Sequence, residues 1–169
     1  MQTNQKTYCA MRSAVICVSI NEIAPLIQAD VKRGADIRLT VTGNSMYPML
    51  RGGRDSVILT APLPDTLKKY AIPFYRRDNG QYILHRIIRI KNGLMSVSGD
   101  NQTCVEYPVG QHQVIAVVKG FYRGNRYIPC NNSLYRFYAW VWANGMPARK
   151  PMMRAYLGIA RMLSKLRKK

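Results

Sequence analysis

Residues 36–42, D-I-R-L-T-V-T, mark the point at which the apolar pattern of the chain changes to a period of two. Ile37, Leu39 and Val41 alternate with polar residues, which indicates a strand with one buried face. A turn-rich stretch follows directly, so the strand ends in a loop rather than in a helix. We therefore expect a mainly β domain to begin here.

Strand patterns continue to residue 129, about three quarters of the way along the chain. Further strands are expected at residues 56–60, 72–76, 81–90, 94–98, 114–122 and 126–129. Turn signals separate several of these strands, at residues 78–80, 92–93 and 124–125, and predict at least three hairpins. The 169-residue chain is long enough for one such domain with appendages. The fold class is expected to be mainly β, with a small barrel over residues 37–129.

The expected appendages flank this domain on both sides. Residues 1–36 should form a strand and a helix, the helix running over 21–33 with Asn21 as its N-cap and Gly34 as its stop. Residues 130–169 should form an aromatic and basic helical tail. Within this tail, residues 150–169 have apolar side chains on one half of a helical wheel and most cations on the other.

The net charge of +18 suits an anionic partner: nucleic acid, lipid headgroups or an acidic peptide. The charge is uneven, because Glu106 is the last carboxylate and residues 107–169 hold 12 of the 26 basic residues. No helix-turn-helix or aromatic RNA-binding signature is present, so nucleic acid is not the expected partner. Two interpretations of 150–169 stay open: an interfacial helix on an anionic membrane, which Trp140 and Trp142 favour, or a helix packed on the barrel.

The sequence predicts a cytoplasmic or peripheral membrane protein. The longest uncharged runs have 12 residues, too few to cross a bilayer, and Arg12 interrupts the short apolar stretch near the start. The four cysteines lie far apart without metal-ligand spacing, so we expect reduced thiols, no metal and no cofactor. The sequence gives no indication of an oligomeric state.

Ser45 and His85 are the residues best suited to nucleophilic chemistry. Histidine occurs only twice, and His85 lies in the run Y-I-L-H-R-I-I-R-I. Strict alternation places it on the same, largely apolar face as Ile83 and Ile87. The ordinary alternative to a catalytic role is therefore a buried core histidine whose ring nitrogens are hydrogen-bonded to the backbone. Ser45 follows a strand in the turn V-T-G-N-S-M-Y-P, where a hydroxyl can be exposed and backbone N–H groups can point at an oxyanion.

Four segments in the same order resemble the superfamily of type I signal peptidases and LexA-type self-cleaving proteins. G-N-S-M-Y-P resembles the nucleophile box, L-H-R-I-I-R-I the strand that bears the base, S-G-D-N (residues 98–101) the later G-D-N box, and residues 114–120 the last core strand. The resemblance covers roughly residues 37–124. The histidine followed by arginine is similar to the archaeal, spore-former and endoplasmic-reticulum-type signal peptidases, which use a Ser/His pair.

This resemblance implies a serine endopeptidase that cleaves a leader or signal-type peptide on a LexA/signal-peptidase-like β-barrel, with 37–129 as its catalytic domain. Ser45 would be the nucleophile and His85 the general base. Asp100 of the G-D-N box, or Glu106 six residues later, would orient the imidazole. Asn44, Ser45 and Met46 would bind the oxyanion and the substrate. Both carboxylates remain candidates, and a turn-forming role for Asp100 is the alternative.

Some positions depart from the family pattern. Gly43 stands where several signal peptidases have a hydroxyl residue, Ala71 replaces a carboxylate, and no stretch of the sequence resembles the N-terminal membrane anchor. These departures motivate an alternative function, a catalytically inactive peptide-binding module on the same fold. A basic nucleic-acid-binding protein and a self-cleaving protein of the LexA type are further alternatives. Asp55 is expected to bond turn amides.

Overall fold

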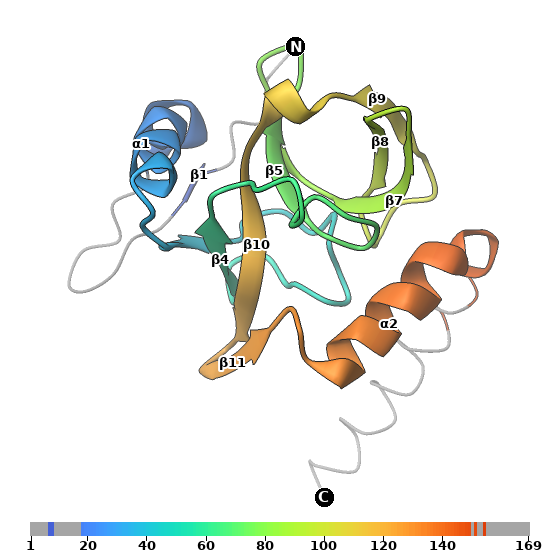
Figure 1. The fold of residues 1–169 in the computed structure, drawn as a ribbon. Helices are drawn as coiled ribbons and strands as arrows, with labels where there is room; N and C mark the ends of the chain where they lie inside the picture. The colour runs from blue at the N-terminus through green and yellow to red at the C-terminus, as the bar shows by residue number, and fades with distance from the viewer. Residues whose placement is uncertain (1–6, 9–17, 150, 152–153, 155–169) are drawn as a thin grey trace, which may run out of the picture.

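The computed structural model describes residues 7–8, 18–149, 151 and 154, and in this part the chain is mainly β (Figure 1). A six-stranded antiparallel sheet has the order β3-β4-β10-β5-β6, with β11 paired to β10; β7-β8-β9 form a second sheet, and β1 pairs with β2. The strands are β1 (Thr7–Tyr8), β2 (Val18–Ser19), β3 (Ile37–Thr40), β4 (Ser56–Thr60), β5 (Pro73–Arg76), β6 (Tyr82–Leu84), β7 (Arg86–Lys91), β8 (Leu94–Ser98), β9 (Glu106–Val109), β10 (Val114–Arg123) and β11 (Arg126–Pro129).

Strand β10 is the centre of the fold, since it pairs with β4, β5 and β11. Its side chains contribute to two separate apolar clusters: Ala116 and Val118 to the one that also contains α1 and the start of α2, Val114 and Val117 to the one enclosed by β7, β8 and β9. From Ala116 onward the side chains alternate between the two faces, and the register shift between Val114 and Ala116 places Val114 on the same side as Val117; a strand buried on both sides reads as a continuous apolar run. The run V-I-A-V-V therefore reflects its central position.

The predicted N-terminal helix is present as α1 (Ile20–Lys32), and Gly34 follows its end with a φ of +87°. Its N-cap is Ser19 rather than the expected Asn21, because the Ser19 hydroxyl accepts a hydrogen bond from the Asn21 N–H at 3.3 Å. Ala24, Ile27 and Val31 are the buried face of α1. Pro25 lies inside the helix, past its first turn, so it cannot donate the i→i−4 hydrogen bond to the Asn21 carbonyl.

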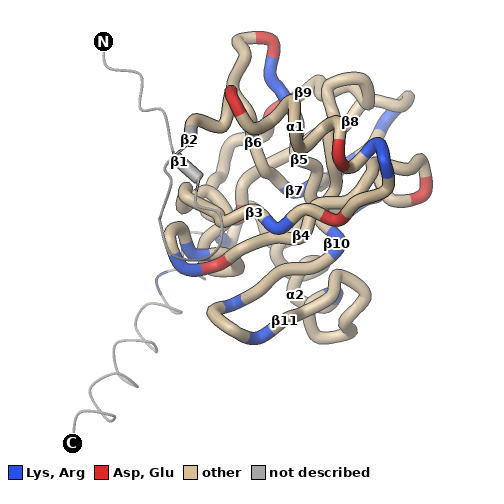
Figure 2. Tube along the Cα trace, turned by 90° about the vertical axis from the view of Figure 1, so that its left-hand side faces the viewer, with Lys and Arg blue, Asp and Glu red and all other residues tan. Residues whose placement is uncertain are grey.

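A second helix, α2 (Ser133–Asn144), forms in the aromatic-rich stretch and ends at the expected break before Gly145; a short 3-10 turn, η2 (Met146–Ala148), follows. Trp142 is buried and Trp140 is exposed. Figure 2 shows basic but no acidic residues along α2 and β11. The helix predicted over 150–169 lies outside the described residues apart from 151 and 154. Among the described residues, no helix is both long and apolar enough to cross a bilayer.

Most of the strand predictions are confirmed. Strands β4, β8 and β11 have the predicted bounds, and hairpins join β5 to β6, β7 to β8 and β10 to β11. In the β7–β8 hairpin, Asn92 and Gly93 have φ values of +51° and +74°, as a two-residue turn of the favoured type requires. Strand β9 had no counterpart among the predictions.

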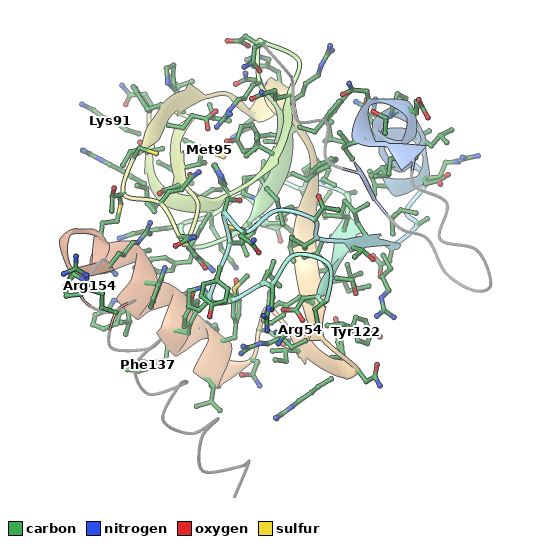
Figure 3. The ribbon with its side chains drawn as sticks, turned by 180° about the vertical axis from the view of Figure 1, so that it is seen from behind. Arg54, Lys91, Met95, Tyr122, Phe137 and Arg154 are labelled. Carbon is green, nitrogen blue, oxygen red and sulfur yellow. The ribbon has the colours of Figure 1, made fainter. Side chains whose placement is uncertain are left out.

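The run over 81–90 was predicted as one strand and is two, which belong to different sheets. β6 ends at Leu84 and pairs with β5, whereas β7 begins at Arg86 and pairs with β8, so His85 occupies the junction. Alternation cannot be counted through such a junction, and His85, Arg86 and Ile87 are all buried. Figure 3 shows Met95 inside the curled sheet that β7 starts and Lys91 at its outer edge.

Ile87 and Ile90 on β7 provide a matched test of this arrangement. Ile87 is fully buried in the apolar cluster that β7 shares with β10, whereas Ile90 is 40% exposed. Ile87→Ala should lower the free energy of unfolding by about 2–5 kcal/mol, because it leaves a cavity in a close-packed cluster. Ile90→Ala should cost far less. Urea denaturation of the two variants measures the difference, and equal losses would contradict the assignment of β7 to this cluster.

Candidate functional site

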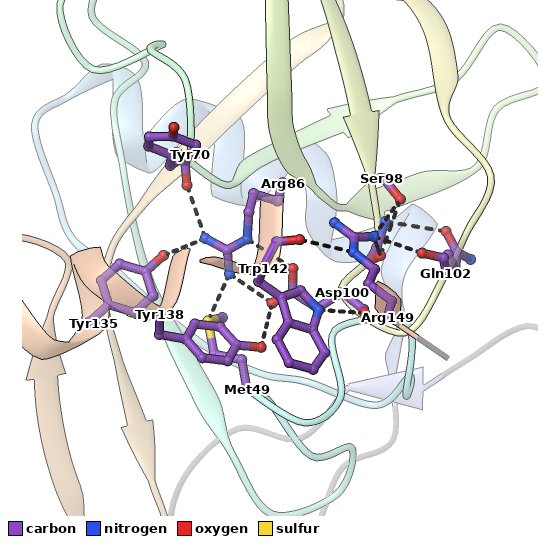
Figure 4. A network of polar contacts seen from close by, with 11 residues as sticks. Met49, Tyr70, Arg86, Ser98, Asp100, Gln102, Tyr135, Tyr138, Trp142 and Arg149 are labelled. Carbon is purple, nitrogen blue, oxygen red and sulfur yellow. Dashed lines mark hydrogen bonds and ion pairs between the residues drawn. The ribbon is translucent and has the colours of Figure 1, made fainter. Parts of the chain in front are cut away.

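A buried ion pair lies at the centre of the candidate site (Figure 4). The Arg86 guanidinium donates from Nε to Oδ1 of Asp100 at 2.8 Å and from Nη2 to Oδ2 at 2.7 Å, and neither side chain is exposed. Arg86 also donates to the Tyr70 carbonyl and the Tyr135 hydroxyl, both at 3.0 Å, and its Nη2 lies 3.0 Å from Sδ of Met49. Its guanidinium therefore contacts four separate segments of the chain.

Helix α2 holds Asp100 from the other side. The Tyr138 hydroxyl donates to Oδ2 of Asp100 at 3.2 Å, and the Trp142 indole donates to the Asp100 carbonyl at 2.6 Å. Beyond the helix, the buried Arg149 donates to the carbonyls of Gly99 and Gln102 at 2.9 and 2.7 Å. Segment 98–102, which contains the G-D-N residues, is therefore fixed by side chains that come from residues 138–149.

This fixed segment lies directly against Ser45. The Asn101 N–H donates to the Ser45 carbonyl at 2.7 Å. A Cβ atom on Gly99 would stand 2.6 Å from the same carbonyl oxygen, closer than real Cβ contacts allow, so the approach requires glycine. On the other side of Ser45, Met46 and Met49 are buried in the core. The Ser45 backbone is consequently held on both sides.

Ser45 also lines a small pocket of about 90 Å³. Thr42 and Gly43 from the same loop, Leu39 from β3, and Tyr82, Ile83 and Leu84 from β6 share the lining; Val41, Met46, Val57 and Phe74 complete it. Because β3 and β6 are the two ends of the main sheet's strand order, the sheet must curl until its edges face one pocket. Ile83 and Leu84 immediately precede His85, so Ser45 and the residues before His85 line one pocket.

His85 is buried and is approached by a chain of polar groups from β5 and β9. Its Nδ1 lies 3.4 Å from the Tyr75 hydroxyl and 3.8 Å from Oε2 of Glu106. The Tyr75 hydroxyl donates to Oε2 of Glu106 at 2.8 Å. Arg77 clamps the same carboxylate, from Nε to Oε1 at 2.8 Å and from Nη2 to Oε2 at 2.6 Å.

This chain selects one tautomer of His85. The Tyr75 hydroxyl has one proton, and it is donated to the carboxylate of Glu106, which can only accept. The hydroxyl oxygen can then only accept from His85, so Nδ1 carries the ring proton and Nε2 keeps its lone pair. An imidazole with a free Nε2 is the form that a general base requires.

The surroundings set the charge states of these groups. Burial is the main cause that lowers the pKa of His85 to about 4, and the negative charge of Glu106 opposes this effect only in part. Burial alone would raise the pKa of Glu106, but the hydrogen bonds from Arg77 and Tyr75 outweigh it and lower that pKa. Burial, together with the Glu106 carboxylate, raises the pKa of Tyr75. At neutral pH the chain holds a neutral imidazole, a neutral phenol and a carboxylate paired with Arg77.

The structure separates the two acidic candidates of the sequence. The carboxylate of Glu106 faces His85, whereas that of Asp100 is taken up by Arg86, the residue that follows His85. No motif in the sequence pointed to Tyr75 and Arg77. Counting outward from the 78–80 turn could have found Tyr75, because that hairpin pairs it with Ile83, two residues before the histidine.

Two further candidates act within the turns around the loop of Ser45. The side-chain oxygen of Asn44 accepts from the Gly52 N–H at 3.3 Å, so it fixes the loop. The buried Asp55 carboxylate accepts from the N–H groups of Arg51 and Gly124 at 2.8 and 3.1 Å, the role expected from the sequence. Burial alone would raise the pKa of Asp55, but its hydrogen bonds lower it.

Metal-ligating side chains do not gather in the described part of the chain: no group of three or more His, Cys, Asp or Glu side chains there could hold a metal ion. Cys104 and Cys130 are free thiols. No protein-family model matches the sequence, and neither a curated protein nor a solved structure matches the chain.

The buried ion pair should be essential for stability. Arg86→Met leaves the Asp100 carboxylate buried without its counter-charge, which should cost about 3–5 kcal/mol of the free energy of unfolding. The double variant Arg86→Met with Asp100→Asn should recover part of this loss. Arg33→Met, which removes an exposed ion pair with Asp30, is the control and should leave the urea midpoint unchanged. An Arg86→Met midpoint equal to wild type would show that the ion pair contributes nothing to stability.

The lowered pKa of His85 predicts a pH dependence of stability. The unfolded histidine has a pKa near 6.5, so between pH 6.5 and about 4 the unfolded chain binds more protons and folding weakens as pH falls. The contribution, up to about 3 kcal/mol, should be complete above pH 6.5 and lost near pH 4. Urea denaturation across this range should show a smaller decrease for His85→Asn than for wild type. Parallel curves would exclude a neutral buried His85.

Proposed function

We propose that this protein is a serine endopeptidase of the signal-peptidase-like superfamily on its Ser/His branch, with Ser45 as nucleophile and His85 as general base. Its substrate would be a leader or signal-type peptide. The proposal rests on four motifs in family order and on one structural observation: the polar chain from Glu106 through Tyr75 to Nδ1 of His85. That chain supplies the orienting group that a Ser/His mechanism requires.

The pocket beside Ser45 supports a peptide substrate. Edge strands β3 and β6 both contribute to its lining, and edge strands present backbone groups to which an extended peptide can pair. The apolar lining and the volume of about 90 Å³ suit a small apolar side chain next to the cleaved bond. Small residues before the cut are what the resemblance to signal peptidases implies.

In the proposed reaction, Nε2 of His85 removes the proton from Oγ of Ser45 as Oγ attacks the peptide carbonyl. Backbone N–H groups near Ser45 stabilise the oxyanion. The imidazolium then gives its proton to the departing amine, which leaves an acyl-enzyme. Water attacks this ester with His85 again as base, and the acid product and free Ser45 are released. Tyr75 and Glu106 keep Nδ1 protonated throughout and stabilise the imidazolium.

One observation favours the alternative of a peptide-binding module without catalysis. Gly43 contributes no hydroxyl to the oxyanion site, and the hydrogen bond that Oδ1 of Asn44 accepts from the Gly52 N–H ties the neighbouring side chain to the loop. A module of this kind would bind leader peptides in the same pocket and leave them intact. Binding without cleavage, unaffected by Ser45→Ala, would identify it.

Active-site labelling tests the nucleophile directly. A fluorophosphonate probe should label the wild-type protein once, because the probe is attacked by an activated serine hydroxyl. Ser45→Ala and His85→Ala should both abolish labelling and leader-peptide cleavage. Ser96→Ala, on β8, is the matched control and should label like wild type. Labelling that survives Ser45→Ala in a folded protein would refute the proposal.

The orienting chain predicts a graded loss of activity. Glu106→Gln should lower kcat by about 10²-fold or more with little change in KM, because the chain acts on the base and not on the substrate. Glu106→Asp should restore part of kcat. Tyr75→Phe should also lower kcat, whereas Tyr107→Phe, at an exposed neighbour of Glu106, should not.

The pH profile separates this role from a structural one. The negative charge of Glu106 raises the pKa of His85, so removing it in Glu106→Gln lowers that pKa further. The acid limb of kcat/KM should therefore move from about pH 4 to a lower pH in this variant. An unchanged limb with equal loss of kcat and stability would show that Glu106 is only structural.

A further inference from the structure

The outer face of α2 is an exposed apolar stripe. Leu134, Phe137 and Trp140 are 80%, 65% and 53% exposed, and the rings of Phe137 and Trp140 stack with centroids 6.1 Å apart. Figure 3 shows Phe137 on the side of α2 that faces away from the sheets. The inner face of the same helix carries Tyr138 and Trp142, which bond to Asp100. The helix is therefore anchored to the protein by its inner face and not by the stripe.

A groove of about 900 Å³ opens beside the stripe, between α2, β10–β11 and residues 65–71. Its lining is largely apolar, including Val117, Pro129, Ala139 and the stripe residues Phe137 and Trp140; the lining cations are Lys68, Lys69, Lys119 and Arg136. Lys68, Lys69 and Arg136 are exposed; Lys69 also donates to Oδ1 of Asn144 at 3.2 Å, and Lys119 pairs with Asp36 at 2.8 Å. Asp65 is the one carboxylate of the described residues in this lining.

We propose that this face, formed by Leu134, Phe137, Trp140, Lys68, Lys69 and Arg136, docks on an anionic phospholipid bilayer. Exposed Leu, Phe and Trp side chains bury apolar area at the headgroup boundary, where Trp is particularly stable. Lys and Arg beside them attract anionic headgroups. A nucleic acid would use the cations and stack on the aromatic rings but would leave Leu134 exposed.

The distribution of charge along the chain favours an anionic bilayer as the occupant of this face over segment 150–169 of the same chain. Residues 107–169 hold 12 basic residues and no carboxylate, and the described Arg154 is exposed. The basic segment 150–169 would repel the cations of the groove if it covered them, whereas both would be attracted to the same anionic surface. The face differs from the one that the sequence suggested, since Trp142 is buried and only Trp140 can reach a membrane.

Vesicle binding by the full chain tests this surface independently of catalysis. The Ser45→Ala protein should float with vesicles of phosphatidylglycerol and phosphatidylcholine, and much less with phosphatidylcholine alone or at high salt. Trp140 emission should shift to the blue on binding, and Trp140→Phe should lose the shift because Trp142 is already buried. If Ser45→Ala binds vesicles while wild type cleaves nothing, this inference stands and the proposed function fails.

Two sets of variants locate the surface. Phe137→Ser with Trp140→Ser should weaken partitioning at least tenfold, and each of Lys68→Glu, Lys69→Glu and Arg136→Glu by about fivefold or more. The controls are Leu26→Ser on α1 and Lys91→Glu at the end of β7. Both residues are exposed away from this face, and both variants should bind like wild type.

Unchanged binding of the double serine variant would show that segment 150–169 binds alone and overturn the proposal. Absence of vesicle binding, with a dimeric mass in sedimentation or Trp140 emission already blue-shifted, would also overturn it.

Discussion

The ion pair between Arg86 and Asp100 is the constraint on which the arrangement of the site depends. Both groups are fully buried, so each would be severely destabilised without the other. The guanidinium also reaches Met49, in the loop that carries Ser45, and the main chain at Tyr70. A single side chain thus links the loop of Ser45, the first strand of the small sheet and the segment 98–102, and His85 is its immediate neighbour in sequence.

The position of His85 at a strand junction gives it access to groups from both sheets. A histidine in the middle of either sheet would face the neighbours of that sheet alone. At the junction its Nδ1 side meets Tyr75 from β5 in the main sheet and Glu106 from β9 in the small one. This geometry gives the two carboxylates different partners: Glu106 faces the imidazole of His85, and Asp100 pairs with the guanidinium of Arg86.

Local patterns predicted the elements well and the site only in part. Alternation and turn residues were sufficient for β4, β8 and β11, because each is a short strand with Gly, Asn or Pro turn signals close to both ends. Alternation failed at His85, where pairing with two different sheets outweighs any local preference. The choice between Asp100 and Glu106 could not be made from spacing, since both follow the histidine closely in sequence. The choice depends on the side chain of Arg86, which points into the core and pairs with Asp100, so that Glu106 is the carboxylate near His85.

The contacts of Arg149 limit how far the chain can be shortened at its C-terminal end. Its guanidinium bonds the carbonyls of Gly99 and Gln102 and the Ser98 hydroxyl, so three acceptors of the G-D-N segment depend on a residue that follows α2. A shortened protein that ends before residue 149 would lose these donors and loosen the segment against which Ser45 packs. Domain boundaries for expression should therefore include residue 149, even when only the β domain is of interest.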